Sequence, residues 1–136
     1  MRMTRKCFCR LAPLALALLV IATAAQAQAT NQLAVDINHA FSAGDKEMAS
    51  GRYVIERSNT NPPILVMRAE TGSSRVMLPV VTRLAQASMN ASDPRLVFDQ
   101  VGDQYFLSEV WMAGQDGFLV RAEKESHEHV VMHAPK

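Results

Sequence analysis

Residues 96–111 read LVFDQVGDQYFLSEVW, and this stretch decides the fold of the chain. Two runs rich in aromatic and β-branched residues flank Gly102-Asp103, a pair that suits the positive φ angle of a tight primed turn. The stretch therefore predicts a β-hairpin. Strict alternation places Tyr105, Leu107 and Trp111 on one face of the second strand, and Phe106 and Val110 on the other. A strand that is apolar on both faces is typical of the middle of a sheet.

Short apolar runs also alternate with turn residues in the rest of the chain after residue 31. Together with the hairpin they predict seven strands, at 32–41, 53–56, 64–68, 76–82, 96–98, 105–111 and 118–120. Pro79 within one of these runs is typical of an edge strand or a bulge. Because helical periodicity is weak, the expected fold class is all-β, either an antiparallel β-sandwich or a small barrel of about seven strands.

The first 27 residues have the pattern of a signal peptide. A basic region precedes the apolar run 11–24, and Ala25-Gln26-Ala27 matches the small-x-small motif after which signal peptidase cuts. We expect a signal peptide helix at 1–27 and a single exported β-domain at 28–136, periplasmic or extracellular. The apolar run has 14 residues, fewer than the roughly 20 of a membrane-spanning helix, and no later stretch is long and apolar enough.

Both cysteines, Cys7 and Cys9, lie in the expected signal peptide, so residues 28–136 offer no disulfide, thiol nucleophile or thiolate metal ligand. The same segment keeps 10 of the 14 basic residues and all 13 acidic ones, which gives a net charge of −3 with neutral histidines. A weakly acidic domain without a basic run argues against nucleic acid and against an anionic membrane surface as partners.

Three of the four histidines lie within seven residues near the C-terminus, at His127, His129 and His133, with Met132 among them. Imidazole suits Zn, Cu and Ni, and a thioether favours Cu(I), so these four side chains are candidate ligands for Zn or Cu. On a strand the three histidines share one face, and on a helix His129 and His133 pair at i, i+4. The HExxH motif is absent, because Val131 stands where its second histidine belongs.

The segment 121–136 fits either a surface helix or a strand through Val130-Val131-Met132. It is rich in Glu and Lys, and little apolar area is available to hold it against the domain. The simplest interpretation is a mobile C-terminal segment with ordinary histidines and no cofactor. A Zn or Cu site is the alternative.

Four aromatic residues are candidates for a surface that stacks on a sugar or a peptide: Tyr53, Tyr105, Phe106 and Trp111. Aromatic residues on a central strand belong more often to the core. No catalytic residue can be assigned, because the chain has no nucleophile elbow, P-loop or dinucleotide-binding motif. We expect Asp99, Asp103 and Glu109 near the hairpin to be solvated in an exposed turn, and the lone His39 to lie in the core or at its rim.

Two segments resemble a family of small secreted bacterial proteins of unknown function. They are Phe41…Gly51-Arg52-Tyr53-Val54 and the hairpin segment Gly102-Asp103-Gln104-Tyr105-Phe106-Leu107. The resemblance implies the same layout over most of the exported domain, but no activity and no catalytic residue. Members of the family tend to end in a basic, charged segment, whereas this chain has His-Glu-His there, so a role of these histidines would be particular to this protein.

An export signal, an all-β pattern and the lack of a catalytic constellation predict a non-enzymatic binding, accessory or envelope-associated module. Its partner is then an envelope polymer or another protein. Two alternatives remain open. The first is a periplasmic metal-binding protein that uses the C-terminal His/Met cluster. The second is a hydrolase of envelope polymers, which needs a cleft with two close carboxylates.

Overall fold

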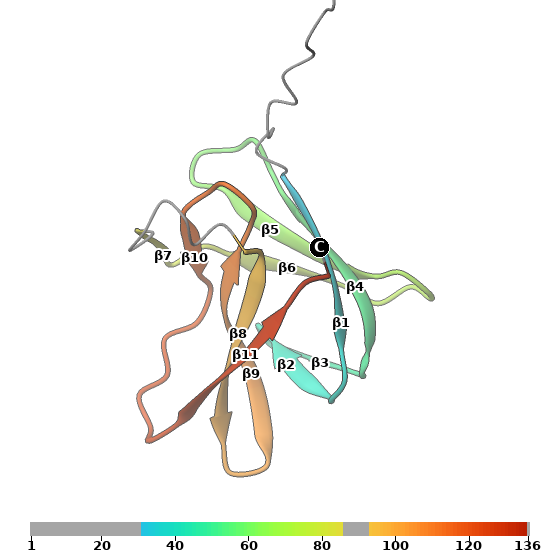
Figure 1. Ribbon diagram of the computed structural model, residues 1–136, viewed down its shortest axis with the longest axis vertical. Helices are drawn as coiled ribbons and strands as arrows, with labels where there is room; N and C mark the ends of the chain where they lie inside the picture. Colours follow the sequence, from blue (N-terminus) through green and yellow to red (C-terminus); the bar gives the residue numbers. More distant parts are fainter. Residues whose placement is uncertain (1–30, 86–92, 136) are drawn as a thin grey trace, which may run out of the picture.

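The computed structural model describes residues 31–85 and 93–135, so the expected signal peptide lies outside the described residues (Figure 1). The described ranges contain eleven strands and no helix, which confirms the all-β class. The strands are β1 (Gln32–Ile37), β2 (Phe41–Ala43), β3 (Lys46–Met48), β4 (Gly51–Arg57), β5 (Ile64–Ala69), β6 (Arg75–Pro79), β7 (Thr82–Leu84), β8 (Arg95–Val101), β9 (Gln104–Trp111), β10 (Gly117–Leu119) and β11 (Glu128–His133). None of the described segments is a helix that could cross a membrane.

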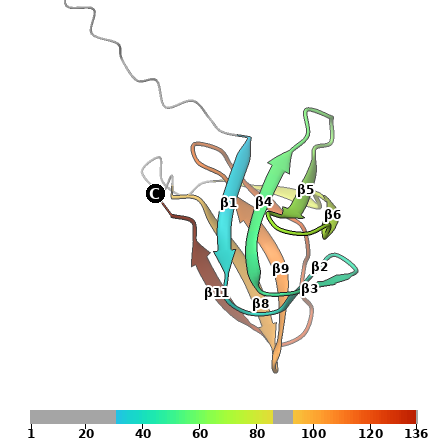
Figure 2. The same ribbon diagram turned by 90° about the vertical axis from the view of Figure 1, so that its right-hand side faces the viewer.

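The strands form two sheets, which Figures 1 and 2 show from two directions. The first has the order β1-β4-β5-β6, and all of its neighbouring strands are antiparallel. The second follows the path β11-β8-β9-β10-β7, also antiparallel, and the β2–β3 hairpin joins it through a parallel pairing of Ser42 with Phe106. Strand β6 lies at an edge of the first sheet and ends at Pro79, as a proline in that run predicts. The single strand expected at 76–82 is wrong, because the run divides there into β6 and β7, which belong to different sheets.

One hydrophobic core lies between the two sheets. Alternate residues of β1, β4, β5 and β8 meet there, because successive side chains of a strand point to opposite faces. Leu107 and Val110 of β9 and Phe118 of β10 complete this part of the core. The largest fully buried side chains include Ile55, Leu65 and Met67 from the first sheet, and Phe98 and Leu107 from the second. Burial of each such side chain contributes about 1.5–3 kcal/mol relative to leaving it exposed.

The predicted hairpin is present as β8 and β9, joined by Gly102-Asp103. Gly102 has a φ angle of +59°, and no residue other than glycine has a positive φ in the ranges that the structure covers. A positive φ at the first central position alone is the pattern of a type II′ turn, whose twist matches that of the flanking strands. The dipeptide therefore sets the pairing of the strands at this end.

A β-bulge at Ser108 reverses the faces of β9 beyond it. Val97 pairs with Glu109 while Phe98 pairs with Leu107, so Ser108 is an extra residue in β9. Leu107 points into the core. Trp111 lies on the outer face of the second sheet and is not part of the core cluster. The expectation that Leu107 and Trp111 share a face is thus wrong, because strict alternation fails at a bulge.

The C-terminal segment contributes β11, which pairs antiparallel with β8 at the edge of the second sheet. Of the helix and the strand that the sequence allowed, the structure has the strand. Val130 and Met132 pack against the core, whereas His129, Val131 and His133 face outward. The expectation of a mobile segment at 121–136 is wrong over 128–133. The alternation of Val130 and Met132 with outward-facing residues gives β11 an apolar inner face, despite its charged composition.

We predict that Leu107→Ala lowers the free energy of unfolding by about 2–5 kcal/mol, because the side chain is fully buried between the sheets. Urea unfolding followed by circular dichroism measures the change. Val81→Ala is the matched control, since Val81 is 62% exposed and its truncation should change stability by less than about 0.5 kcal/mol. A loss below about 1 kcal/mol for Leu107→Ala would mean that β9 is not central to the core.

Candidate metal centre

Asp99 lies on the outer face of β8, yet its side chain is only 2% exposed. Its neighbours across the sheet are Phe106 on β9 and His129 on β11. The expectation of a solvated carboxylate in an exposed turn is therefore wrong for Asp99. A carboxylate that is removed from water is costly unless a cation or hydrogen-bond donors compensate its charge. The contacts of the Asp99 side chain therefore indicate which groups could compensate its charge on the outer face.

The bulge at Ser108 holds the connection from β10 to β11 against this face. The Ser108 carbonyl accepts hydrogen bonds from the amides of Val120 (2.8 Å) and Arg121 (3.3 Å), and its Oγ donates to the Arg121 carbonyl (3.2 Å). Arg121 then places its guanidinium carbon 3.7 Å from the centre of the Phe106 ring. Residues from 121 onward thus begin their path directly beside Asp99.

Glu123 shapes the next turn of this connection. Its Oε1 accepts hydrogen bonds from the amides of Lys124 (2.8 Å) and Glu125 (3.1 Å), and its Oε2 pairs with Arg121 Nη2 at 2.6 Å. The amide of Glu125, and next that of Lys124, lower the pKa of Glu123 below the ordinary value of 4.5; burial opposes this, and the charges of Arg121 and His127 add to the lowering. The turn leaves the carbonyl of Glu125 2.7 Å from Nδ1 of His127.

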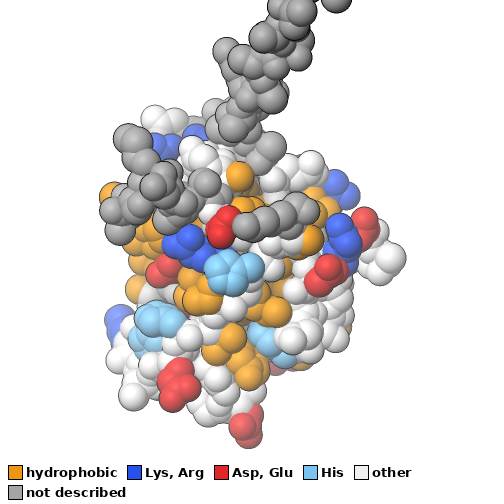
Figure 3. Space-filling model, in the orientation of Figure 1, with side chains coloured by type: hydrophobic (Ala, Val, Ile, Leu, Met, Phe, Trp, Pro, Cys, Tyr) orange, Lys and Arg blue, Asp and Glu red, His pale blue; other side chains and the backbone are white. Residues whose placement is uncertain are grey.

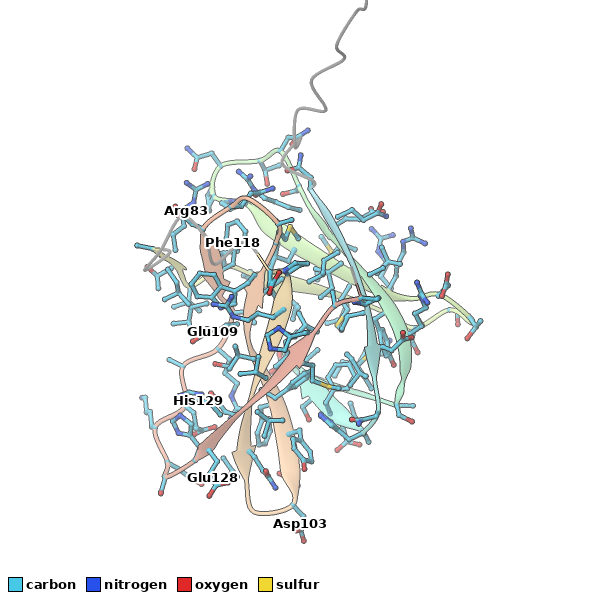
Figure 4. All side chains as sticks on the ribbon, viewed as in Figure 1. Arg83, Asp103, Glu109, Phe118, Glu128 and His129 are labelled. Carbon is cyan, nitrogen blue, oxygen red and sulfur yellow. The ribbon has the colours of Figure 1, made fainter. Side chains whose placement is uncertain are left out.

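Two imidazoles converge on one oxygen of Asp99. With Nδ1–H of His127 donating to the Glu125 carbonyl, the lone pair of the ring is on Nε2, which lies 3.7 Å from Asp99 Oδ1. His129 Nδ1 lies 2.9 Å from the same oxygen. The ligand atoms of the three residues all fall within 4.8 Å of one another. Figure 4 labels His129 at the start of β11, on the side of the connection that leads into this strand.

Asp99 Oδ1 is buried but makes no hydrogen bond to any residue that the structure describes. The approach of His129 Nδ1 is short enough for one, but its direction is not that of a hydrogen bond. An unsatisfied buried polar atom costs about 1–3 kcal/mol, and more when it is charged. A tetrahedral Zn²⁺ ion holds its nitrogen and oxygen ligands roughly 3.3–3.4 Å from one another. The two observed separations lie on either side of this value.

Sequence reasoning found two of the three converging residues. His127 and His129 belong to the predicted ligand set, but Met132 and His133 do not join them. Met132 packs against the core, and His133 lies opposite Arg95, roughly 13 Å along the strand from His129. Figure 3 accordingly shows histidine side chains at separate places on this face. Asp99 was missed because the strand was predicted to end at Phe98, whereas β8 continues to Val101 and includes the carboxylate.

The four candidate aromatic residues do not form a common recognition surface. Tyr53 is buried in the core and donates its hydroxyl to the Ala49 carbonyl at 2.6 Å. Tyr105 stacks on the imidazole of His39 at the rim of the core, with ring centres 3.9 Å apart. Phe106 is covered by Arg121, as described above. These three rings therefore have partners within the domain.

Trp111 is also engaged within the domain. The guanidinium carbon of Arg95 lies 4.4 Å from the centre of its ring, and its Nε1 donates to Glu109 Oε2 at 2.7 Å. The ring packs so closely on Gly117 that an added Cβ there would lie 2.6 Å from it. The indole fills space on the outer face and leaves little area for a ligand, with 8% of the residue exposed.

No protein-family model, no curated protein and no solved structure matches this chain. The resemblance to small secreted bacterial proteins stays a prediction.

We predict that Glu123→Gln weakens the acid sensitivity of the fold. The pKa of Glu123 is lower in the folded chain than its ordinary value of 4.5, so the carboxylate stabilises the fold above that pH. This contribution is lost as the pH falls through the folded-state pKa. Urea unfolding between pH 7 and pH 3 should show a lower stability of the variant at pH 7 and a smaller decline toward pH 3.

Glu125→Gln is the control, because the Glu125 carboxylate makes no ion pair or hydrogen bond within the described part of the chain. This variant should keep the pH dependence of the unchanged protein. If Glu123→Gln keeps it as well, the carboxylate of Glu123 does not organise the turn.

Proposed function

We propose that this protein is an exported, non-enzymatic β-sandwich domain that binds one Zn²⁺ ion through Asp99, His127 and His129. The observation that carries the proposal is the buried, unsatisfied Oδ1 of Asp99 between two imidazole nitrogens. A cation at this point satisfies the carboxylate and uses the lone pairs of both rings. The signal-peptide pattern of residues 1–27 supports export to the periplasm or beyond the cell.

The ligand chemistry favours Zn²⁺ over the copper alternative. Met132 faces the core, so the site has no thioether, and nothing in it favours Cu(I). Two imidazoles and one carboxylate suit Zn²⁺, which imposes no geometry through its d electrons, and they leave a fourth position to solvent or a ligand. A polar hollow of about 360 Å³ lies beside His127, and Gln100, Gly102, Ser126 and Glu128 complete its lining.

The surroundings of the ligands hold them in place before the ion arrives. Histidines that bind metals usually donate their second ring nitrogen to a carbonyl or carboxylate, and the Glu125 carbonyl fills this role for His127. The backbone of His129 is fixed opposite Asp99 by the pairing of β11 with β8. Two or three histidines on a free tail would bind metals weakly, whereas a preorganised set loses less entropy on binding.

Zn²⁺ titration by calorimetry tests the site on protein purified from the export compartment and stripped with a chelator. We expect one equivalent to bind with submicromolar affinity. His129→Ala and Asp99→Asn should each weaken binding by at least about 100-fold, because second-sphere changes alone cost 10–100-fold. His133→Ala is the matched control, since it removes a histidine from the same face of the same strand, outside the cluster.

The stability of the stripped protein provides an independent readout. Asp99→Asn removes the unsatisfied buried charge, so the variant should be at least as stable as the metal-free parent, yet gain nothing when Zn²⁺ is added. The proposal fails if Zn²⁺ binds equally to the parent and to Asp99→Asn, or if His133→Ala weakens binding as much as His129→Ala does. Either result would assign the metal to loosely held surface histidines.

Export has its own test. Mass spectrometry of the protein recovered from the export compartment should show a new N-terminus at Gln28, after the motif Ala25-Gln26-Ala27, or at Thr30 when the cut follows Ala29. Ala27→Arg replaces the small residue that signal peptidase requires before the cut, so the signal peptide should stay attached. A species from the export compartment that begins at Met1 would contradict processing.

A further inference from the structure

Two arginines from different sheets meet at one aromatic ring, away from the metal ligands. Arg57 ends β4 of the first sheet, and Arg83 is the cross-strand neighbour of Phe118 in the β7–β10 pair of the second. Their guanidinium carbons lie 5.6 and 5.9 Å from the centre of the Phe118 ring. Figure 4 labels Arg83 and Phe118 at this end of the second sheet.

The positive charge at this place has no carboxylate to balance it. All 13 Asp and Glu residues of the chain fall within the described ranges, and none has an oxygen within 4.0 Å of a nitrogen of Arg57 or Arg83. Asp116 lines the same hollow, but it too makes no ion pair with either arginine. Two cations that share one ring without a counterion repel each other.

Hydrogen bonds within the domain hold the Arg57 guanidinium in this position. Its Nη1 donates to Gln115 Oε1 at 3.0 Å, and Gln115 Nε2 donates in turn to Asn31 Oδ1 at 3.2 Å. Its Nε is buried and has no hydrogen-bond partner in the part of the chain that the structure describes. The guanidinium is therefore partly withdrawn from water with incomplete compensation, which increases the gain from an anion placed beside it.

A hollow of about 290 Å³ opens in front of the two guanidinium groups, and its walls are mainly polar. Guanidinium groups bind phosphate oxygens through parallel N–H bonds, and two of them can clamp one group from opposite sides. We propose that Arg57 and Arg83 form a binding site for a phosphate group, either as inorganic phosphate or as a phosphate monoester carried by a small ligand. This site is independent of the metal centre.

Two-dimensional NMR of the uniformly ¹⁵N-labelled exported protein tests the site with two probes, sodium phosphate and glycerol phosphate. Each is titrated against sodium chloride of equal ionic strength, in the Asp99→Asn background so that phosphate cannot act through a bound metal. We expect saturable shifts of the amides of 114–118 with phosphate and smaller ones elsewhere. Tighter binding of glycerol phosphate than of inorganic phosphate would assign the site to an ester.

The variants separate a site from general attraction to positive charge. Arg83→Ala should weaken phosphate binding at least tenfold. Arg75→Ala is the control and should leave binding unchanged, because this substitution removes the same charge from an exposed position on β6, outside the hollow. Asp116→Asn should tighten binding, since it removes a negative charge from the hollow. Arg57→Lys keeps the positive charge but loses the parallel N–H donors of the guanidinium. It should weaken phosphate binding while the domain stays folded.

Three results would overturn the proposal. The amide shifts could remain linear with phosphate concentration to 20 mM, as for non-specific screening. Arg83→Ala and Arg75→Ala could weaken binding equally. Asp116→Asn could leave binding unchanged while destabilising the fold, which would show that the Asp116 carboxylate is the counterion of the arginines in solution.

Discussion

The outer face of the second sheet depends on one extra residue, Ser108 in β9. Its insertion turns Trp111 away from the core and leaves the Ser108 carbonyl outside the ladder, where the amides of Val120 and Arg121 bind it. The connection from β10 to β11 therefore runs across the outer face of the sheet and not into solvent. Asp99 is covered by this chain segment, and the need to compensate its charge follows from that cover.

Much of the fold could be predicted, because strands and turns leave local signals. Short apolar runs between turn residues located β4 and β5, and Gly102-Asp103 located the central hairpin. Alternation with period two located β1, but the strand expected at 32–41 divides into β1 and β2. The bulge left no such signal, since Ser108 is compatible with a regular strand. β11 was obscured because glutamates and histidines outnumber Val130 and Met132, whose alternation alone gives the strand an inner face.

The candidate site was predictable only in part. The spacing of His127 and His129 drew attention to them, but their partner is set by the register between β8 and β11, which brings His129 opposite Asp99. Register is decided by the fit of whole faces against the core, and a pattern within either segment does not encode it. The arginines near Phe118 were missed for the same reason, since they lie on strands of different sheets.

The distance along the chain between Asp99 and His127 has a consequence for a protein with no cysteine beyond Cys9. The Zn²⁺ ion that we propose for these residues would close the intervening chain into a ring and tie β11 to β8. A disulfide across a loop of this length is worth about 3–4 kcal/mol. Such a staple is indifferent to oxidants and reductants, and it opens and closes with the supply of metal.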